Sequence, residues 1–345
     1  MLTSELDYVL PKELIAQHPV SPRDSSRLLL LNRRSGDIQH YIFRDLPQIL
    51  SPGDCLVVNE TRVMPLRLLG TKAEGGARIE VLLLENNGNP WEWIGLAKRA
   101  KRLKAGVHVE FGGGFRCRIL EDLGCGRFKF HFEGQGDFWQ LLEKHGEIPL
   151  PPYIDRTGGP SEEDQQRYQT VYAEVPGSSA APTAGLHFTP ELIEQLQEKG
   201  ILIAKITLHV GPDTFRPIQT DKVEEHPIHS ERYIITDHAA DLINRTLDAQ
   251  GRIIAVGTTT VRTLESAASP EGQIISEQGT TRLFIHPGYT FKIVRAMITN
   301  FHLPRTTLLA LVHTFGGSEH LKKAYEEAIR LRYRFYSYGD AMLIV

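Results

Sequence analysis

Two segments in the second half of the chain combine histidine with small and polar residues, in a pattern that is neither helical nor strand-like. They are residues 179–188 (SAAPTAGLHF) and residues 298–304 (ITNFHLP). Small residues let a ligand approach the backbone closely, and an imidazole can accept or donate a proton near neutral pH. A buried structural loop with a satisfied histidine is the alternative for either segment alone. We expect both segments to belong to an enzyme active site.

Four short motifs each contain one histidine that could transfer a proton. They are GLHF at 185–188, LHVG at 208–211, IHSE at 228–231 and FHLP at 301–304. A lone histidine with apolar flanks is usually a core residue, but four in one part of the chain favour proton transfer. A metal site is the rival interpretation. The chain has no HxH or HExxH spacing and no paired thiolates among its three cysteines, so we expect no metal.

Residues 252–265 (RIIAVGTTTVRTLE) predict a strand, a glycine turn and a helix. This order places the amides and hydroxyls of residues 257–260 at a helix amino terminus, which favours a carboxylate or a phosphate. A threonine-capped helix without a ligand fits the same letters.

The net charge of −3 argues against broad affinity for nucleic acid, so any such contact must be local. Residues 98–104 (KRAKRLK) hold five basic residues in seven. Residues 330–338 (RLRYRFYSY) interleave arginine with aromatic residues that could stack on unpaired bases. Most basic runs are solvated surface, and the second segment also fits a helix end packed into the core.

The order of the predicted elements indicates two domains. Residues 67–132 hold short alternating strands separated by glycine- and asparagine-rich turns, with Phe128, Phe130 and Phe132 on one face. Elsewhere helices and apolar strands alternate, and Thr189 caps a helix with Pro190 at its first position. We predict an α/β main domain built from both chain ends (1–61 and 151–345), with a small antiparallel β-barrel inserted at 62–150.

The first residues include early acidic side chains and no apolar export segment, and no later apolar run approaches the ~18 residues of a membrane span. Three cysteines without CxxC spacing fit a reducing compartment. We expect a cytoplasmic protein without membrane contact and, because no long apolar heptad is present, a monomer.

Ten segments, in order along the chain, resemble those of one family: the S-adenosylmethionine:tRNA ribosyltransferase-isomerases of queuosine biosynthesis. The segments are SSRLLLLNR, VVNETRVMPLRLLG, GEIPLPPYI, YQTVYAEVPGSSAAPTAGLHFT, HVGPDTF, HSERY, VGTTTVRTLE, FIHPGY, ITNFHLP and YGDAML. Three positions depart from the family: Glu60 replaces the usual Asp, Ser179 a common Val, and Asp213 the usual Gly. The last departure bears on whether that turn contacts a ligand.

The resemblance implies the fold predicted above, a cytoplasmic location and a two-substrate reaction. In this family the ribosyl part of S-adenosylmethionine is transferred to the aminomethyl group of a 7-deazaguanine base (preQ1) in tRNA and rearranged to an epoxycyclopentane. Adenine and methionine leave. The resemblance therefore implies S-adenosylmethionine as co-substrate, preQ1-bearing tRNA as partner, and no recycled cofactor.

That chemistry suggests roles for the catalytic candidates. The carbon next to a sulfonium is acidic, so one base and one acid are the minimum. We expect the base to be His187 or His302. The further proton-transfer candidates and the carboxylates that could hold adenine or an imidazole are His209, His229, Glu231 and Asp340.

The same chemistry suggests binding residues. For S-adenosylmethionine we expect a set with Arg262 on the methionine carboxylate: Thr183, Gly185, Gly257, Thr258, Thr259, Thr260, Arg262 and Asn300. For tRNA we expect basic residues from segments 98–104 and 330–338 and from the start of the barrel to contribute. They are Arg62, Lys98, Arg99, Lys101, Arg102, Lys104 and Arg332.

Two other functions fit part of the sequence. An RNA methyltransferase would use the same co-substrate, but the chain lacks a glycine-rich cofactor loop: FEGQGD at 132–137 has no third glycine and is followed by a proline-rich linker. A non-catalytic RNA-binding module built on the barrel would leave the histidine-bearing loops unexplained.

Overall fold

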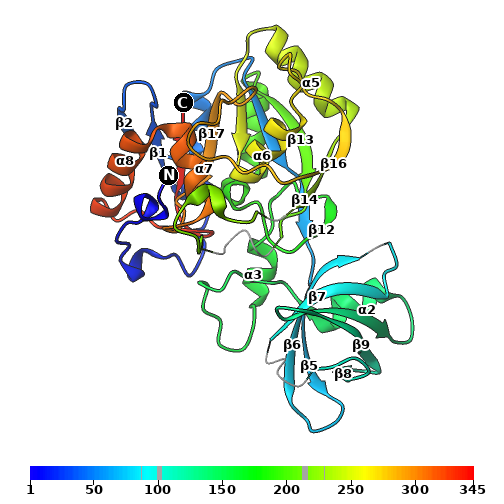
Figure 1. Ribbon diagram of the computed structural model, residues 1–345. Coiled ribbons are helices and arrows are strands. Elements are labelled where there is room, and N and C mark those ends of the chain that lie inside the picture. The colour runs from blue at the N-terminus through cyan, green and yellow to red at the C-terminus, as the bar shows by residue number, and fades with distance from the viewer. Residues whose placement is uncertain (87, 99–102, 212–216, 229) are drawn as a thin grey trace.

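The computed structural model describes residues 1–86, 88–98, 103–211, 217–228 and 230–345. Five residues named above lie outside these ranges: Arg99, Lys101, Arg102, Asp213 and His229. The chain forms a large α/β domain and a smaller barrel (Figure 1), which confirms the predicted fold class. In the large domain the blue amino-terminal strands lie among orange and red carboxy-terminal elements, whereas the barrel is cyan to green.

A nine-stranded mixed sheet forms the centre of the large domain, in the order β16-β14-β13-β3-β15-β17-β18-β1-β2. Its strands are short and, in the middle of the sheet, buried along their whole length. They are β1 (Arg27–Leu31), β2 (Ile38–Ile42), β3 (Cys55–Asn59), β13 (Leu202–Leu208), β14 (Glu231–Ile235), β15 (Ile253–Val256), β16 (Glu277–Thr281), β17 (Ala296–Asn300) and β18 (Ala341–Ile344).

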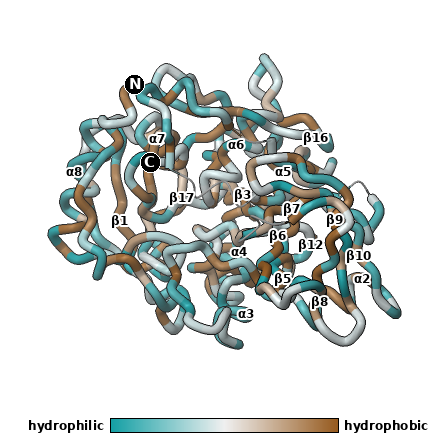
Figure 2. Tube along the Cα trace, turned by 60° about the horizontal axis from the view of Figure 1, so that its bottom comes forward, coloured by the Kyte–Doolittle hydropathy of each residue, from teal (hydrophilic) through white to brown (hydrophobic). Residues whose placement is uncertain are grey.

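Helices cover both faces of this sheet, so two apolar layers form its core. One layer includes α5 (Asp237–Asp248), α6 (Thr258–Ala267), α7 (Thr307–Gly316) and α8 (Ser318–Arg330). The other includes α1 (Leu46–Ile49) and α4 (Pro190–Glu198). Thr189 caps α4 by accepting from Leu192 N, as predicted. In the tube view of Figure 2 the apolar segments gather in the strands.

Short elements complete the large domain. They are α3 (Glu162–Arg167) and the 3₁₀ helices η1 (Thr3–Leu6), η2 (Lys12–Leu14), η3 (Arg23–Ser25), η4 (Phe43–Asp45), η5 (Thr183–His187) and η7 (Val223–Glu225). Within the described ranges, no helix has the length and apolar character needed to cross a membrane.

The barrel is antiparallel and closes on itself because β5 pairs with both β6 and β8. Phe128, Phe130 and Phe132 all point into its core, which confirms the predicted alternation. Its strands lie between Arg67 and Glu147, inside the predicted insertion of residues 62–150. They are β5 (Arg67–Lys72), β6 (Arg78–Asn86), β7 (Glu92–Lys98), β8 (His108–Gly112), β9 (Phe115–Gly124), β10 (Arg127–Glu133) and β11 (Gly146–Glu147), with α2 at Phe138–His145.

Two chain segments connect the domains. The outgoing strand β4 (Thr61–Val63) pairs in parallel with β12 (Val175–Ser178), which lies on the returning path. This pairing holds the start of the barrel next to the loop that leads to His187.

The directions of the central strands bring distant segments to one edge of the sheet. β13, β3, β15 and β17 run parallel, so their carboxyl ends meet there. β18 runs antiparallel to β17 and parallel to β1, so the amino ends of β18 and β1 lie at the same edge.

Candidate functional site

His187 lies at this edge, between the residue that precedes β1 and the last residue of β17. Its Nδ1 is 2.7 Å from Ser26 Oγ, and its Nε2 is 3.2 Å from Asn300 Nδ2. Asn300 Nδ2 also donates to the Tyr336 carbonyl, at 3.0 Å, which fixes the amide as a donor. His187 Nε2 is therefore an acceptor, and Nδ1 carries the proton and donates to Ser26.

The surroundings of His187 hold it neutral. The ring stacks on Phe43 with 4.9 Å between centroids and is almost wholly buried. Burial, with smaller contributions from Arg334 and Arg23, lowers the His187 pKa to about 3. Because both ring nitrogens are hydrogen-bonded to the protein, these contacts argue against His187 as the base and favour a positioning role.

His302 follows β17 and is also buried. Its Nε2 is 2.7 Å from Thr299 Oγ1, its backbone N–H donates to Tyr325 Oη, and burial lowers its pKa to about 3. Two small cavities of about 30 Å³ each are lined by His302, Thr183 and Asn300. The two histidine-bearing segments thus meet, as the sequence predicts, but around spaces that hold only a few waters.

The amino terminus of α6 faces one of these small cavities. Gly257, Thr258 and Thr259 line it, and Gly257 has φ of 94°, a conformation that favours glycine. No side chain of the described ranges caps this helix, and Thr260 Oγ1 donates back to the Val256 carbonyl, at 2.8 Å. The helix amino terminus is in the predicted place, but Gly257 N donates to the Ile298 carbonyl, at 2.8 Å, and the Thr260 hydroxyl is used within the helix.

Gly185 has a packing role. A Cβ atom there would lie 2.1 Å from Tyr172 Oη and 2.8 Å from Thr170 Cγ2. The lack of a side chain is therefore required by the protein's own packing, and the predicted contact of Gly185 with S-adenosylmethionine has no support in this geometry.

A much larger cavity, of about 770 Å³, lies between the large domain and the barrel. It shares Val210 and Leu308 with one of the small cavities. The predicted residues His209, Glu231 and Arg262 line it from the large domain, and Trp93, Trp139 and Arg127 from the barrel. Its volume lies within the ~300–1,000 Å³ that is usual for small-molecule sites.

His209 presents an open ring nitrogen at this cavity. Its Nδ1 is 2.9 Å from Thr61 Oγ1, whereas Nε2 has no hydrogen-bond partner among the residues that the structure describes. The ring packs on Gly177, where a Cβ would lie 2.7 Å from His209 Cε1. Burial and then Arg232 lower the His209 pKa, so the imidazole is neutral at pH 7.

Glu231 and Arg262 form a buried ion pair in the wall of the large cavity. Arg262 Nε also donates to the Leu283 carbonyl, at 3.0 Å, and Glu231 accepts from Gly211 N, at 3.3 Å. Arg262 Nη2 is buried and has no partner in the described part of the chain. An unsatisfied guanidinium N–H in a residue that lines a cavity is a candidate for contact with an anionic ligand.

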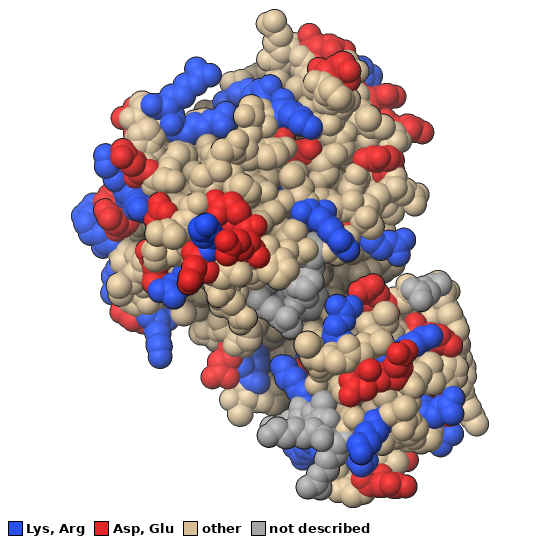
Figure 3. Space-filling model, viewed as in Figure 1, with Lys and Arg blue, Asp and Glu red and all other residues tan. Residues whose placement is uncertain are grey.

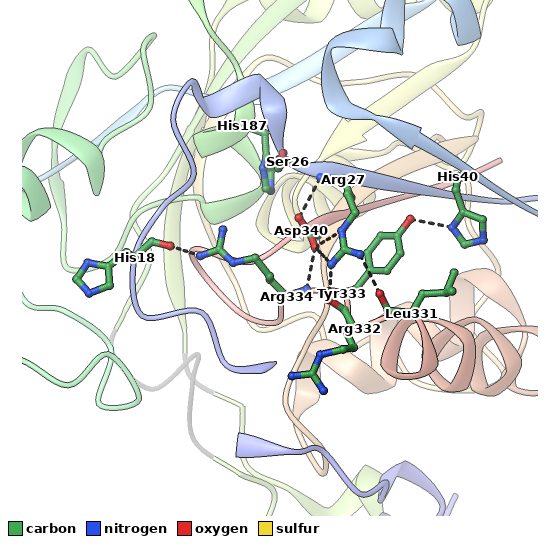
Figure 4. Close-up of polar contacts among 10 residues, drawn as sticks. All are labelled: His18, Ser26, Arg27, His40, His187, Leu331, Arg332, Tyr333, Arg334 and Asp340. Atoms are coloured by element: carbon green, nitrogen blue, oxygen red, sulfur yellow. Dashed lines mark hydrogen bonds and ion pairs between the residues drawn. The ribbon is translucent and has the colours of Figure 1, made fainter. Parts of the chain in front are cut away.

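Asp340 is occupied by the protein itself. It accepts from the backbone N and the guanidinium of Arg27 and from Arg334 N, at 2.8–3.1 Å (Figure 4). Arg27 in turn donates to the carbonyls of Leu331 and Arg332 and lies 4.1 Å from the centre of the Tyr333 ring. These contacts assign Asp340 to anchoring the last loop, and they include no imidazole.

The predicted tRNA-binding residues are spread apart. Arg62, on β4, and Lys104 are exposed. Lys98, on β7, is paired with Glu80 at 2.9 Å. Arg332 lies on the large domain, 4.0 Å from Glu13. Basic and acidic side chains intermingle on the face shown in Figure 3. Trp139, Arg232 and Arg282 also line the large cavity but were not among the predicted residues. Arg232 lies in the HSERY segment, whereas Trp139 and Arg282 lie in none of the ten family segments.

The fold and the cavity define a two-domain protein whose ligand-sized site is shared by an α/β domain and an inserted barrel. Within the described ranges, no group of three or more His, Cys, Asp or Glu side chains is placed to hold a metal ion.

Comparisons with known proteins show the family to which this two-domain chain belongs. A sequence model of the family described as queuosine biosynthesis protein matches residues 3–344. Proteins named S-adenosylmethionine:tRNA ribosyltransferase-isomerase are 52% identical in Desulfitobacterium hafniense and 50% in Symbiobacterium thermophilum, each with full coverage of both chains. The crystal structure of S-adenosylmethionine tRNA ribosyltransferase from Thermotoga maritima is 38% identical, with TM-score 0.56 over 99% of this chain and all of its own. The chain belongs to this family of queuosine biosynthesis enzymes, which confirms the resemblance.

The buried histidines predict sensitivity to acid. Between the ordinary pKa of 6.5 and the folded value of about 3, the unfolded chain binds a proton at His187 that the folded chain does not. The free energy of unfolding therefore falls as the pH drops through this window, by up to about 1.4 kcal/mol per pH unit for each such group. Denaturant titrations from pH 7 to pH 5 should show a shallower fall in His187→Gln than in the parent.

The exposed His238 provides the control. His238→Gln should leave the pH slope of the unfolding free energy unchanged. A slope in His187→Gln equal to that of the parent would contradict a buried, neutral imidazole at this position.

Proposed function

We propose that this chain transfers the ribosyl part of S-adenosylmethionine to the aminomethyl group of a 7-deazaguanine base in tRNA and isomerises it, releasing adenine and methionine. The observation that best supports the proposal is the cavity of about 770 Å³ between the two domains. A site with walls from two domains suits a reaction that joins a small molecule to a base of a large one. The proposal includes a cytoplasmic monomer that needs no metal and no recycled cofactor.

His209 is our candidate for the base, in place of His187 or His302. The reaction needs an acceptor for the proton on the carbon next to the sulfonium, after which the ylide expels adenine as the ribose ring opens. A neutral imidazole with an open, unprotonated nitrogen meets that need. His209 is neutral and lines the ligand-sized cavity, and its Nε2 has this role in the tautomer in which Nδ1–H donates to Thr61. His187 lacks an open nitrogen, and His302 faces only the small cavities.

Arg262 is our candidate for holding the methionine carboxylate. Its Nη1 is paired with Glu231, its buried Nη2 has no partner among the described residues, and the residue lines the large cavity. The amides of Thr258 and Thr259 open instead to the small cavity that shares Val210 and Leu308 with the large one. Arg262 and the amino terminus of α6 therefore lie at two neighbouring cavities. We assign the methionine carboxylate to Arg262 because it lines the larger one.

The products of the reaction test the function as a whole. Incubation of the protein with S-adenosylmethionine and preQ1-bearing tRNA should release free adenine and methionine, and omission of any one component should abolish the release. Release of S-adenosylhomocysteine would indicate a methyltransferase instead. RNA binding without any change in S-adenosylmethionine would indicate a binding module.

The role of His209 predicts a kinetic defect. His209→Gln should lower kcat by ~10²–10⁴, the usual contribution of a general base, with only a small change in KM for S-adenosylmethionine. His226 lines the same cavity and gives a matched control, because His226→Gln should keep most of the turnover. Full activity in His209→Gln would rule out this assignment of the base.

The role of Arg262 predicts a binding defect. Arg262→Lys keeps a positive charge beside Glu231 but removes the fork that reaches a second anion. KM for S-adenosylmethionine should rise by roughly tenfold, as expected for the loss of one charge-assisted hydrogen bond, with KM for tRNA unchanged. Arg252→Lys, which alters an arginine paired with Asp54 at the opposite edge of the sheet, is the control and should leave both constants as they are.

A further inference from the structure

The barrel side of the large cavity carries an exposed indole on a rigid support. Trp139, on α2, lines the cavity and keeps 39% of its surface exposed. It packs edge-on against Trp93, with 6.0 Å between ring centroids, and against Phe138, at 5.4 Å. Asp137 caps the helix beneath it by accepting from Trp139 N and Gln140 N. The ring is therefore held in place while part of it remains uncovered.

The large-domain side of the same cavity carries two exposed arginines. Arg232 lies opposite Thr280 in the β14–β16 pair, Arg282 directly follows β16, and both arginines line the cavity. Neither has an ion-pair partner among the described residues. Arg127, in the same cavity wall, by contrast pairs with Glu85 at 3.0 Å.

We propose that this cavity captures one unpaired base of RNA, with the base stacked on Trp139 and its flanking phosphates held by Arg232 and Arg282. The inference rests on the proposed function and names the residues that would position the nucleic acid. Single-stranded RNA is held in this way, by aromatic side chains that stack on bases and by arginines that neutralise the backbone. One cavity is lined by an exposed indole and by two arginines that have no ion-pair partner in the described part of the chain, and these supply both parts.

The shape of the site favours an unpaired base over duplex RNA. A base must leave its stack to enter a cavity between two domains, which loops allow at little cost. The predicted basic set gives weaker support, because Lys98 is paired with Glu80 and the described members of the set do not face the cavity. Trp139, Arg232 and Arg282 therefore replace that set as the residues we expect to hold the reacting nucleotide.

Tryptophan fluorescence provides a direct test. The chain has three tryptophans, and Trp139 is the one with a large exposed surface. Titration of the full-length protein with the preQ1-bearing stem-loop of its tRNA should quench the emission, because stacking places a base on the indole. Trp139→Phe should lose most of the quenching while nearly keeping the affinity. Trp139→Ala should weaken binding by about 5- to 150-fold, the effect of losing one base–aromatic stack.

Salt dependence tests the arginines separately. The double variant Arg232→Gln and Arg282→Gln should reduce the slope of log affinity against log salt by roughly 0.7 for each phosphate that the protein no longer neutralises. Arg118→Gln, at an exposed arginine of the barrel that does not line the cavity, is the matched control and should keep the parental slope.

The outcomes separate this inference from the proposed function. If the parent releases adenine but Trp139→Ala and the double arginine variant bind the stem-loop as the parent does, the base site is wrong and the reaction stands. If the parent releases no adenine but its quenching depends on Trp139, the base site stands and the reaction is wrong. Equal quenching by a fully paired duplex, which offers no unpaired base, would also overturn the base site.

Discussion

The mixed polarity of the central sheet is the constraint on which the site depends. Parallel strands alone would bring the carboxyl ends of β3, β13, β15 and β17 to one edge. The reversed pair β18 and β1 adds its amino ends there, and with them Ser26, Arg27 and Asp340. Ligand sites in open α/β sheets lie at the carboxyl ends of the strands, and this sheet follows that rule while supplying polar groups from both directions.

The Arg27–Asp340 ion pair fixes the reversed strands at that edge. Asp340 is buried and accepts hydrogen bonds from four nitrogens: the backbone N, Nε and Nη2 of Arg27 and the backbone N of Arg334. Arg27 also donates to the carbonyls of Leu331 and Arg332. The segment held in this way includes Arg332 and Tyr336 with positive φ, of 56° and 71°, which is costly for residues with a side chain. The bent segment delivers the Tyr336 carbonyl to Asn300, and Asn300 sets the tautomer of His187.

The fold could be predicted from the sequence because the relevant signals are local. These signals are the alternation in residues 127–133, the helix start at Thr189–Pro190 and the ten continuous family segments. The structure confirms the fold class that they indicate. The distribution of the site residues among cavities was not predictable in the same way. Whether His187 Nε2 meets Asn300 or a ligand depends on contacts across 113 positions, and Trp139, Arg232 and Arg282 become one group only when the barrel faces the sheet edge.

In our proposal, the small polar loops that stand out in the sequence support the site, and His209 forms its reactive surface. Burial lowers the pKa of His187 and His302 to about 3, so in the folded protein both are neutral hydrogen-bonding groups that cannot titrate near pH 7. Such groups order their neighbours through hydrogen bonds, but they lower the free energy of unfolding at acid pH, which apolar side chains would not do. That cost is understandable if Thr183, Asn300 and the α6 terminus must stay rigid beside a cavity in which the less buried His209 meets the ligand. The rigid inner layer and the outer cavity with one wall from the barrel are then two parts of one site.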